Sequence, residues 1–169
     1  TLGRSGGTQA LLDGDVTGAA AILVEAAASD HADSESAVYG GGFFGDFQSS
    51  AYAEVTSSVV TDAPVGTHAV LTGIKTGLTI LANADNSAVA SSTTASGGAI
   101  NIQGTHPEAR DRGTTLAQLL GSVGATATSF GPDGSPVTIG VPGAVAISVS
   151  AIASDYTSAT VDSDGGGAI

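Results

Sequence analysis

A block of strand-like sequence occurs three times in the chain, at 22–44, 78–100 and 145–169. Each copy begins as an alternation of apolar and polar residues, in which the apolar members shrink from Ile and Val to Ala. It then reaches an Asp, crosses a run of Ser, Thr and Ala, and ends in glycines. A period of two is that of a β-strand, and glycines at a fixed place mark a bend. A strand and bend that recur predict a repeat architecture, in which successive copies stack on one another.

The size of the side chains favours a thin fold. The chain has 25 Gly, 4% aromatic residues and no Cys, Met or Trp, and much of its 41% hydrophobic fraction is Ala. Each of these side chains buries little area, which disfavours a globule with a bulky core and favours close stacking of strands. We therefore predict an all-β, elongated fold of β-solenoid turns or stacked sheets. An antiparallel β-sandwich is the alternative, because it has a similar number of strands and similar turn spacing.

The glycines that end the blocks divide the chain into units. We predict a single β-repeat region over 1–169 with three degenerate units, at about 1–44, 45–100 and 101–169. Gly41 and Gly97 are 56 positions apart, whereas Gly97 and Gly166 are 69 positions apart. The third unit should therefore contain an insertion.

The insertion is predicted at 103–124, where the alternation breaks down. Residues 114–121 begin with Thr and end with Gly, as a short capped helix does. Insertions in repeat proteins often lie on one face and carry the function. We therefore predict a 103–124 insertion with a short helix.

Charge limits the possible partners. Four basic and sixteen acidic residues give a net charge of −12, which disfavours nucleic acid and anionic membranes as partners. No apolar run approaches the length of a membrane helix, so membrane insertion is not expected. Position 1 is Thr, and the third block stops where the second continues into 101–102. We therefore expect the chain to be a piece of a longer or processed protein.

Acidic turns are the candidate metal sites. Asp30, Asp33 and Glu35 lie close together beside His31, and Ca²⁺ binds six to eight oxygen ligands that such carboxylates can supply. Solubilising charge at the end of a strand is the alternative. Calcium is thus the one cofactor that we consider.

Aromatic residues cluster between positions 39 and 52. They are Tyr39, Phe43, Phe44, Phe47 and Tyr52. In a chain with Ala-sized core residues they are either a hydrophobic plug at the end of the stack or an interface with a ligand or subunit, since aromatic residues concentrate binding energy.

No catalytic constellation is evident, and we predict that the chain is not an enzyme. Residues 3–7 match G-x-S-x-G, but a nucleophile elbow needs a strand before it and a helix after it. The three histidines have no zinc-binding spacing.

The pattern resembles the β-strand repeats of very large bacterial surface proteins, in which Ala/Thr/Val alternations end in a Gly-rich step before a second alternation. The matching segments are 40–44, 51–59, 65–71, 78–84, 97–100 and 145–169. The resemblance covers most of the chain except roughly 103–135, and it implies an extracellular, fibrous protein at the cell surface.

Two functions follow as hypotheses. The first is an extracellular structural protein, a subunit or segment of a self-assembling surface filament, sheath or adhesin stalk, whose partner is a further copy of itself. The second is a binding module of a surface adhesin that contacts a glycan or a cell-surface protein.

Overall fold

The computed structural model describes residues 6–124, 127–130, 136–139 and 145–166. These residues contain thirteen strands and no helix: β1 Gly7–Gln9, β2 Asp15–Thr17, β3 Ala21–Gly41, β4 Phe44–Val55, β5 Val60–Val65, β6 Val70–Thr72, β7 Gly77–Gly97, β8 Ile100–Asp111, β9 Thr114–Leu119, β10 Ser122–Gly124, β11 Ala127–Phe130, β12 Pro136–Ile139 and β13 Ala146–Gly166.

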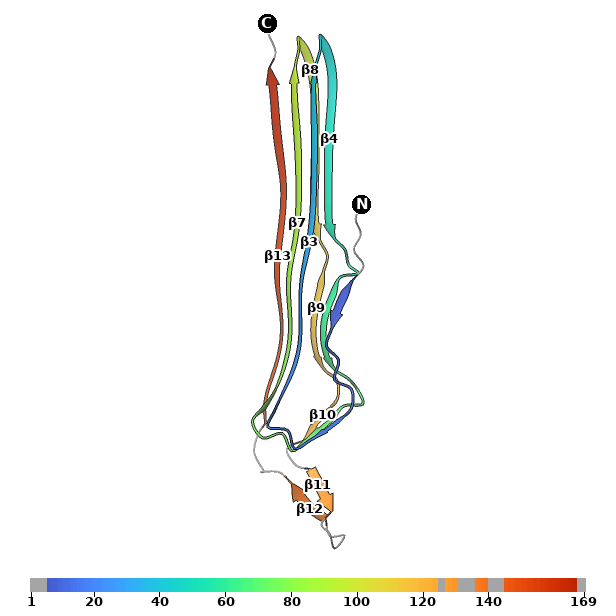
Figure 1. Cartoon of the computed structure of the whole chain (residues 1–169), viewed down its shortest axis with the longest axis vertical. Coiled ribbons are helices and arrows are strands. Elements are labelled where there is room, and N and C mark those ends of the chain that lie inside the picture. Colours follow the sequence, from blue (N-terminus) through green and yellow to red (C-terminus); the bar gives the residue numbers. More distant parts are fainter. Residues whose placement is uncertain (1–5, 125–126, 131–135, 140–144, 167–169) are drawn as a thin grey trace.

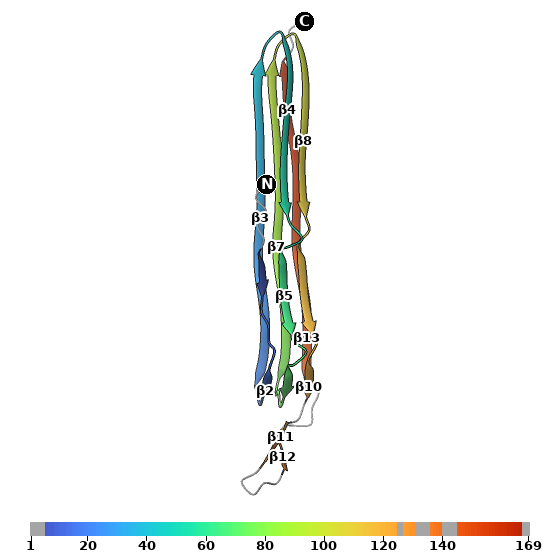
Figure 2. The ribbon, with the colours of Figure 1, turned by 90° about the vertical axis from the view of Figure 1, so that its right-hand side faces the viewer.

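The strands form a flat stack of two layers (Figures 1 and 2). One layer is a parallel sheet of the three 21-residue strands, in the order β13-β7-β3. The chain reverses at the glycine-rich tip and returns along the other layer as β4, β5 and β6, then in the next turn as β8, β9 and β10. These shorter strands also pair in parallel with their counterparts one turn away. The all-β prediction of stacked parallel strands is confirmed, and the antiparallel sandwich is wrong.

The returning strands are staggered against the long sheet. β4 and β5 each contact β3 and β7, whereas β8 and β9 each contact β7 and β13. The central strand β7 is therefore covered along both flanks, but β13 is covered along only one. This stagger decides which parts of the stack are buried.

The buried core changes character along the stack. At the lower end of Figure 1 it contains the larger residues Leu71, Leu78 and Ile80, and midway it contains Ala53 and Ala88. Nearer the tip the core becomes polar, and three serine side chains are linked by hydrogen bonds across it. The Ser92 hydroxyl donates to Ser49 Oγ (2.8 Å), and the Ser49 hydroxyl donates to Ser36 Oγ (2.9 Å). Small side chains let the layers approach, and paired hydroxyls offset the cost of burying polar groups.

Glycines are required at two kinds of corner. Gly18 and Gly73 occupy the same corner in successive turns, with φ of 73° and 67°, a left-handed conformation that favours glycine. At the tip, a Cβ at Gly40 or Gly45 would overlap the ring of Phe47. The sequence-predicted bend is thus built around one inward aromatic ring.

The prediction of an insertion with a helix at 103–124 is wrong. These residues belong to β8, β9 and β10, which pair in register with the preceding turn at offsets of 56, 54 and 52 positions. The Thr and Gly at 114 and 121 resemble helix caps, but pairing with β5 outweighs that weak local preference.

The extra length lies instead between β10 and β13. Gly124 and Ala146 are 22 positions apart, whereas Thr72 and Gly77, at the same place one turn earlier, are 5 apart. The described residues of this segment form the antiparallel hairpin β11–β12, which projects from the end of the stack opposite the tip (Figure 1).

Candidate functional site: the open edges of the stack

The stack ends in two edges that lack a neighbour. β3 lies at one side of the long sheet and β13 at the other, and no other strand that the structure describes pairs with their outer edges. In the returning layer, β8 lies at the β13 side and β4 at the β3 side. Unpaired N–H and C=O groups along such edges are ready to add another strand.

The edge at β13 exposes side chains that are buried one turn earlier. Ile147 pairs with Leu78, and Val149 pairs with Ile80. Leu78 and Ile80 are 0% exposed, whereas Ile147 is 48% and Val149 is 44% exposed. The four residues share one inward row, so the difference arises because nothing in the described structure covers the free flank of β13.

The opposite edge carries an apolar groove of about 540 Å³. Its lining includes Leu12 and Val16 from the segment that contains β1 and β2, and Ile22 and Val24 from β3. The same residues pack on their other side against the buried core. The groove is thus the place where the apolar core of the stack is exposed, at the edge formed by the first turn.

A polar row crosses the core at mid-height. Asp30, Asn86 and Asp155 occupy the same register position on β3, β7 and β13. Asn86 is 2% exposed, and its Nδ2 donates to Asp155 Oδ1 at 3.3 Å. Asp111 of β8 faces this row from the other layer and accepts a hydrogen bond of 2.8 Å from the Gly113 backbone N–H.

The Asp111 carboxyl is electrostatically unfavourable when charged. Burial raises its pKa above the usual value, and the negative charges of Asp155 and Asp30 raise it further, whereas the Gly113 N–H lowers it. Asp111 Oδ2 and Asn86 Oδ1 are buried without a hydrogen-bond partner. This part of the core therefore collects carboxylates that nothing neutralises among the described residues.

The predicted calcium ligands do not converge. Asp30 alternates with Asp33 and Glu35 along β3, so it faces the opposite layer while the other two face outward. Within the described residues, no group of three or more His, Cys, Asp or Glu side chains is arranged to hold a metal ion.

The predicted aromatic cluster divides into three parts, of which Tyr52 is described further below. Phe47 points inward between the tip glycines. Tyr39, Phe43 and Phe44 are exposed near the tip, where the Phe43 and Phe44 rings meet edge to face at 4.8 Å. Phe47 is thus taken up by packing at the tip, whereas Tyr39, Phe43 and Phe44 lie exposed.

The aliphatic side chains Ile100 and Ile102 extend this exposed surface. They are 52% and 63% exposed and line a shallow groove of about 230 Å³ together with Phe44. We call Phe43, Phe44, Ile100 and Ile102 the apolar tip.

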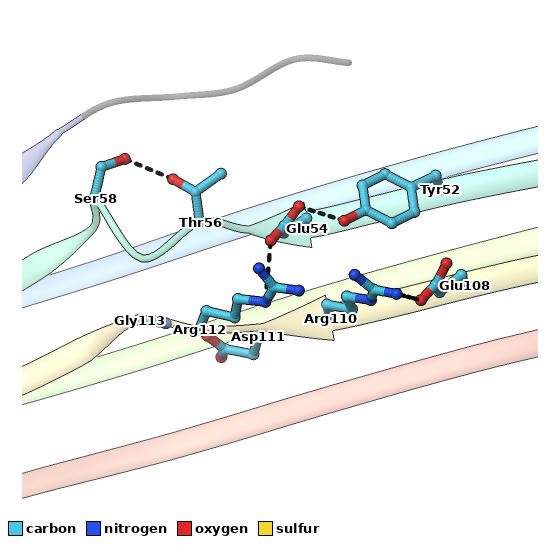
Figure 3. A network of polar contacts seen from close by, with 9 residues as sticks. All are labelled: Tyr52, Glu54, Thr56, Ser58, Glu108, Arg110, Asp111, Arg112 and Gly113. Carbon is cyan, nitrogen blue, oxygen red and sulfur yellow. Dashed lines mark hydrogen bonds and ion pairs between the residues drawn. The ribbon is translucent and has the colours of Figure 1, made fainter.

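Tyr52 belongs to a charged network on the outer face of β4 and β8 (Figure 3). Its hydroxyl donates to Glu54, which raises the Tyr52 pKa, and the Arg110 guanidinium lies 5.7 Å from the ring centroid. Arg112 Nε lies 3.3 Å from Glu54 Oε1, and Arg110 pairs with Glu108. Each arginine is matched by a carboxylate, so the network offers no unbalanced charge to an ionic ligand.

Comparison of the chain with protein-family models, with curated proteins and with solved structures finds no match. No helix long and apolar enough to span a membrane is found in the described part of the chain.

The sequence pattern does not single out the exposed row on β13. Ile147 and Val149 follow the same alternation as their buried equivalents in β7, and the alternation reports only which residues share a face. Whether that face is covered depends on the stagger between the two layers.

Proposed function

We propose that the chain is an extracellular structural protein that acts as a subunit or segment of a self-assembling surface filament, sheath or adhesin stalk. The observation that carries the proposal is the pair of open edges, which present the same register of side chains at opposite sides of one parallel stack. A contact between two different edges is heterologous, and when it is repeated without closing it generates a filament.

The register predicts which residues would meet in such a contact. Position 22 aligns with 78 and 147, and position 24 aligns with 80 and 149. If β13 of one copy pairs with β3 of the next as its own turns pair, Ile147 lies beside Ile22 and Val149 beside Val24. The apolar rows then continue across the junction.

The short strands at the start of the chain fit the same arrangement. β1 lies at the edge of the β1-β5-β9 sheet and β2 at the edge of the β10-β6-β2 sheet. In a continued stack, β1 and β2 of the next copy lie beyond β9 and β10, against the free flank of β13. Leu12 and Val16 of that copy then cover the exposed apolar row. Exclusion of this apolar surface from water is the driving force for assembly.

The extracellular location rests on the resemblance to bacterial surface repeats. The acidic composition is compatible with it, because a strong net charge opposes non-specific aggregation. A specific register is then needed to bring copies together.

An engineered disulfide tests the proposal directly, because the chain has no cysteine. Ala27 of β3 and Ile152 of β13 both pair with Asn83, so within one copy they lie two strand spacings apart. That separation is roughly 9.6 Å, beyond the reach of a disulfide, whereas in the proposed junction the two positions are about 4.8 Å apart. The double variant Ala27→Cys/Ile152→Cys should therefore form a ladder of linear oligomers on a non-reducing gel.

The matched control combines Ala27→Cys with Ser148→Cys, which lies four positions from the proposed register and should not cross-link. Equal cross-linking of both pairs contradicts the register. A wild-type protein that stays monomeric at all concentrations, with no fibres by electron microscopy, contradicts self-assembly itself.

A binding module is the second candidate, and the apolar tip favours it. Phe43 and Phe44 are 70% and 69% exposed, and contiguous exposed apolar residues mark interaction sites. The variant Phe43→Ser/Phe44→Ser should lose binding to a glycan array or to a cell surface under this hypothesis. It should leave edge-to-edge assembly intact, because the tip lies outside the proposed junction.

A further inference from the structure

The row of Asp30, Asn86 and Asp155 has a consequence at the junction between copies. Within one copy, the neutral Asn86 separates the two carboxylates by two strand spacings. In the register of the proposed filament, Asp155 of one copy becomes the direct neighbour of Asp30 of the next. The two side chains then share the inward face of the long sheet, about 4.8 Å apart.

We propose that protonation of this carboxyl pair controls the head-to-tail junction, so that filaments form as the pH falls and come apart as it rises. This inference rests on the proposed self-assembly. Two carboxylates at this spacing repel each other when both are charged, so one takes a proton from solvent and donates a hydrogen bond to the other. The junction therefore binds more protons than the separated copies.

The surroundings of the pair contain no compensating cation among the described residues. Asp111 of β8 faces Asp155 and adds a third carboxyl. Burial raises its pKa, and the charges of Asp155 and Asp30 raise it further. On the β3 side, Glu54 and His31 line a small pocket beside Asp30. The arginines of this region, Arg110 and Arg112, pair with Glu108 and Glu54 on the outer face. Acidification thus removes repulsion that no other described group offsets.

The Asp30–Asp155 pair is the one place in this register where two acidic residues of β3 and β13 would be neighbours. Every other acidic residue of β3 and β13 meets a neutral residue in this register. The pairs are Glu25 with Ser150, Asp33 with Ser158, Glu35 with Thr160, Ala37 with Asp162, and Tyr39 with Asp164. One position out of the 21 in the strand therefore carries the pH dependence.

The sign follows from proton linkage. The junction binds a proton that the separated copies do not bind, so assembly is favoured at acidic pH and is lost as the pH rises. Replacing one Asp by the isosteric Asn should remove most of this dependence. The junction would then pair Asn with Asp, as Asn86 and Asp155 already do within the copy.

The experiment measures the critical concentration for assembly of the full chain by light scattering and electron microscopy, from about pH 8 to about pH 5 and with EDTA present. The wild type should assemble only toward the acidic end. Asp155→Asn should assemble throughout, with a critical concentration lower on the order of tenfold at the upper pH. Asp30→Asn changes the other member of the pair and should behave alike.

The matched control is Asp162→Asn, which removes the same charge from the outer face of β13. This variant distinguishes the effect of the Asp30–Asp155 pair from the effect of a lower net negative charge on the whole chain. The pH dependence of its assembly should follow that of the wild type. If Asp155→Asn and Asp30→Asn also follow the wild type, the inference is overturned while self-assembly stands.

Two other results are decisive in different ways. Assembly of the wild type at about pH 8 on addition of Ca²⁺, reversed by EDTA, identifies a cation in place of the proton and overturns the inference. Failure of every variant to assemble at any pH refutes the proposed function itself. Circular dichroism and urea unfolding of each variant exclude misfolding as the reason.

Discussion

The stagger of the two layers predicts that equivalent core residues contribute unequally to stability. Leu78→Ala and Ile147→Ala remove similar aliphatic groups from one row of the long sheet, on neighbouring strands. Leu78 is fully buried, whereas Ile147 is about half exposed because β13 has one uncovered flank. Because the two residues are similar in size and occupy the same register position, a difference between the two losses of stability reports how completely the opposite layer covers each residue.

The magnitudes follow from burial. Leu78→Ala loses about 2–3 kcal/mol of transfer free energy and leaves a cavity between tightly packed layers, so a total of about 3–4 kcal/mol is expected. Ile147→Ala loses about half the transfer term and leaves no enclosed cavity, which gives about 1 kcal/mol. The expected difference is therefore about 2–3 kcal/mol in the free energy of unfolding.

Urea unfolding, followed by circular dichroism, measures both values on dilute, monomeric protein. The same comparison on assembled material should reduce the difference, because the next copy would cover Ile147 as β5 and β9 of the returning layer cover Leu78 in β7. Equal losses for the two variants in the monomer would refute the reasoning, since they would mean that the β13 flank is already covered.

Three further predictions follow from local geometry. Gly40→Ala should destabilise the tip because its methyl group would overlap the Phe47 ring, whereas Gly97→Ala, whose added Cβ would meet no atom within 4 Å, should be tolerated. Thermal unfolding of both variants, and rescue of Gly40→Ala by Phe47→Ala, test this. Asp111→Asn should raise the free energy of unfolding at neutral pH, because the raised pKa means that the charged carboxyl is disfavoured in the folded state. This gain should disappear at acidic pH, where the wild-type carboxyl is protonated in both states, and an unchanged gain in urea titrations at both pH values contradicts it. Replacing 127–139, which includes the hairpin β11–β12, by a short Gly/Ser linker should leave the unfolding transition nearly unchanged, because these strands pack mainly against each other.

Parts of the candidate site were accessible from the sequence. The strand period already places position 30 on the opposite face from 33 and 35, so the separation of Asp30 from Asp33 and Glu35 could have been foreseen. The same parity separates Phe47 from Phe44. The proximity of Asp111 to Asp155 could not, because it depends on how one layer lies over the other.

The sequence by itself determined the strands, their inward and outward faces and the glycine bends, because these depend on local alternation and on the absence of a Cβ. It misplaced the insertion, since the residues at 114–121 have local preferences that pairing with β5 outweighs. Only the tertiary structure decided that Leu78 is buried and Ile147 is not, and that the polar row ends in an Asp at each edge. Burial depends on the stacking of distant strands, and an alternation within one strand carries no information about its neighbours.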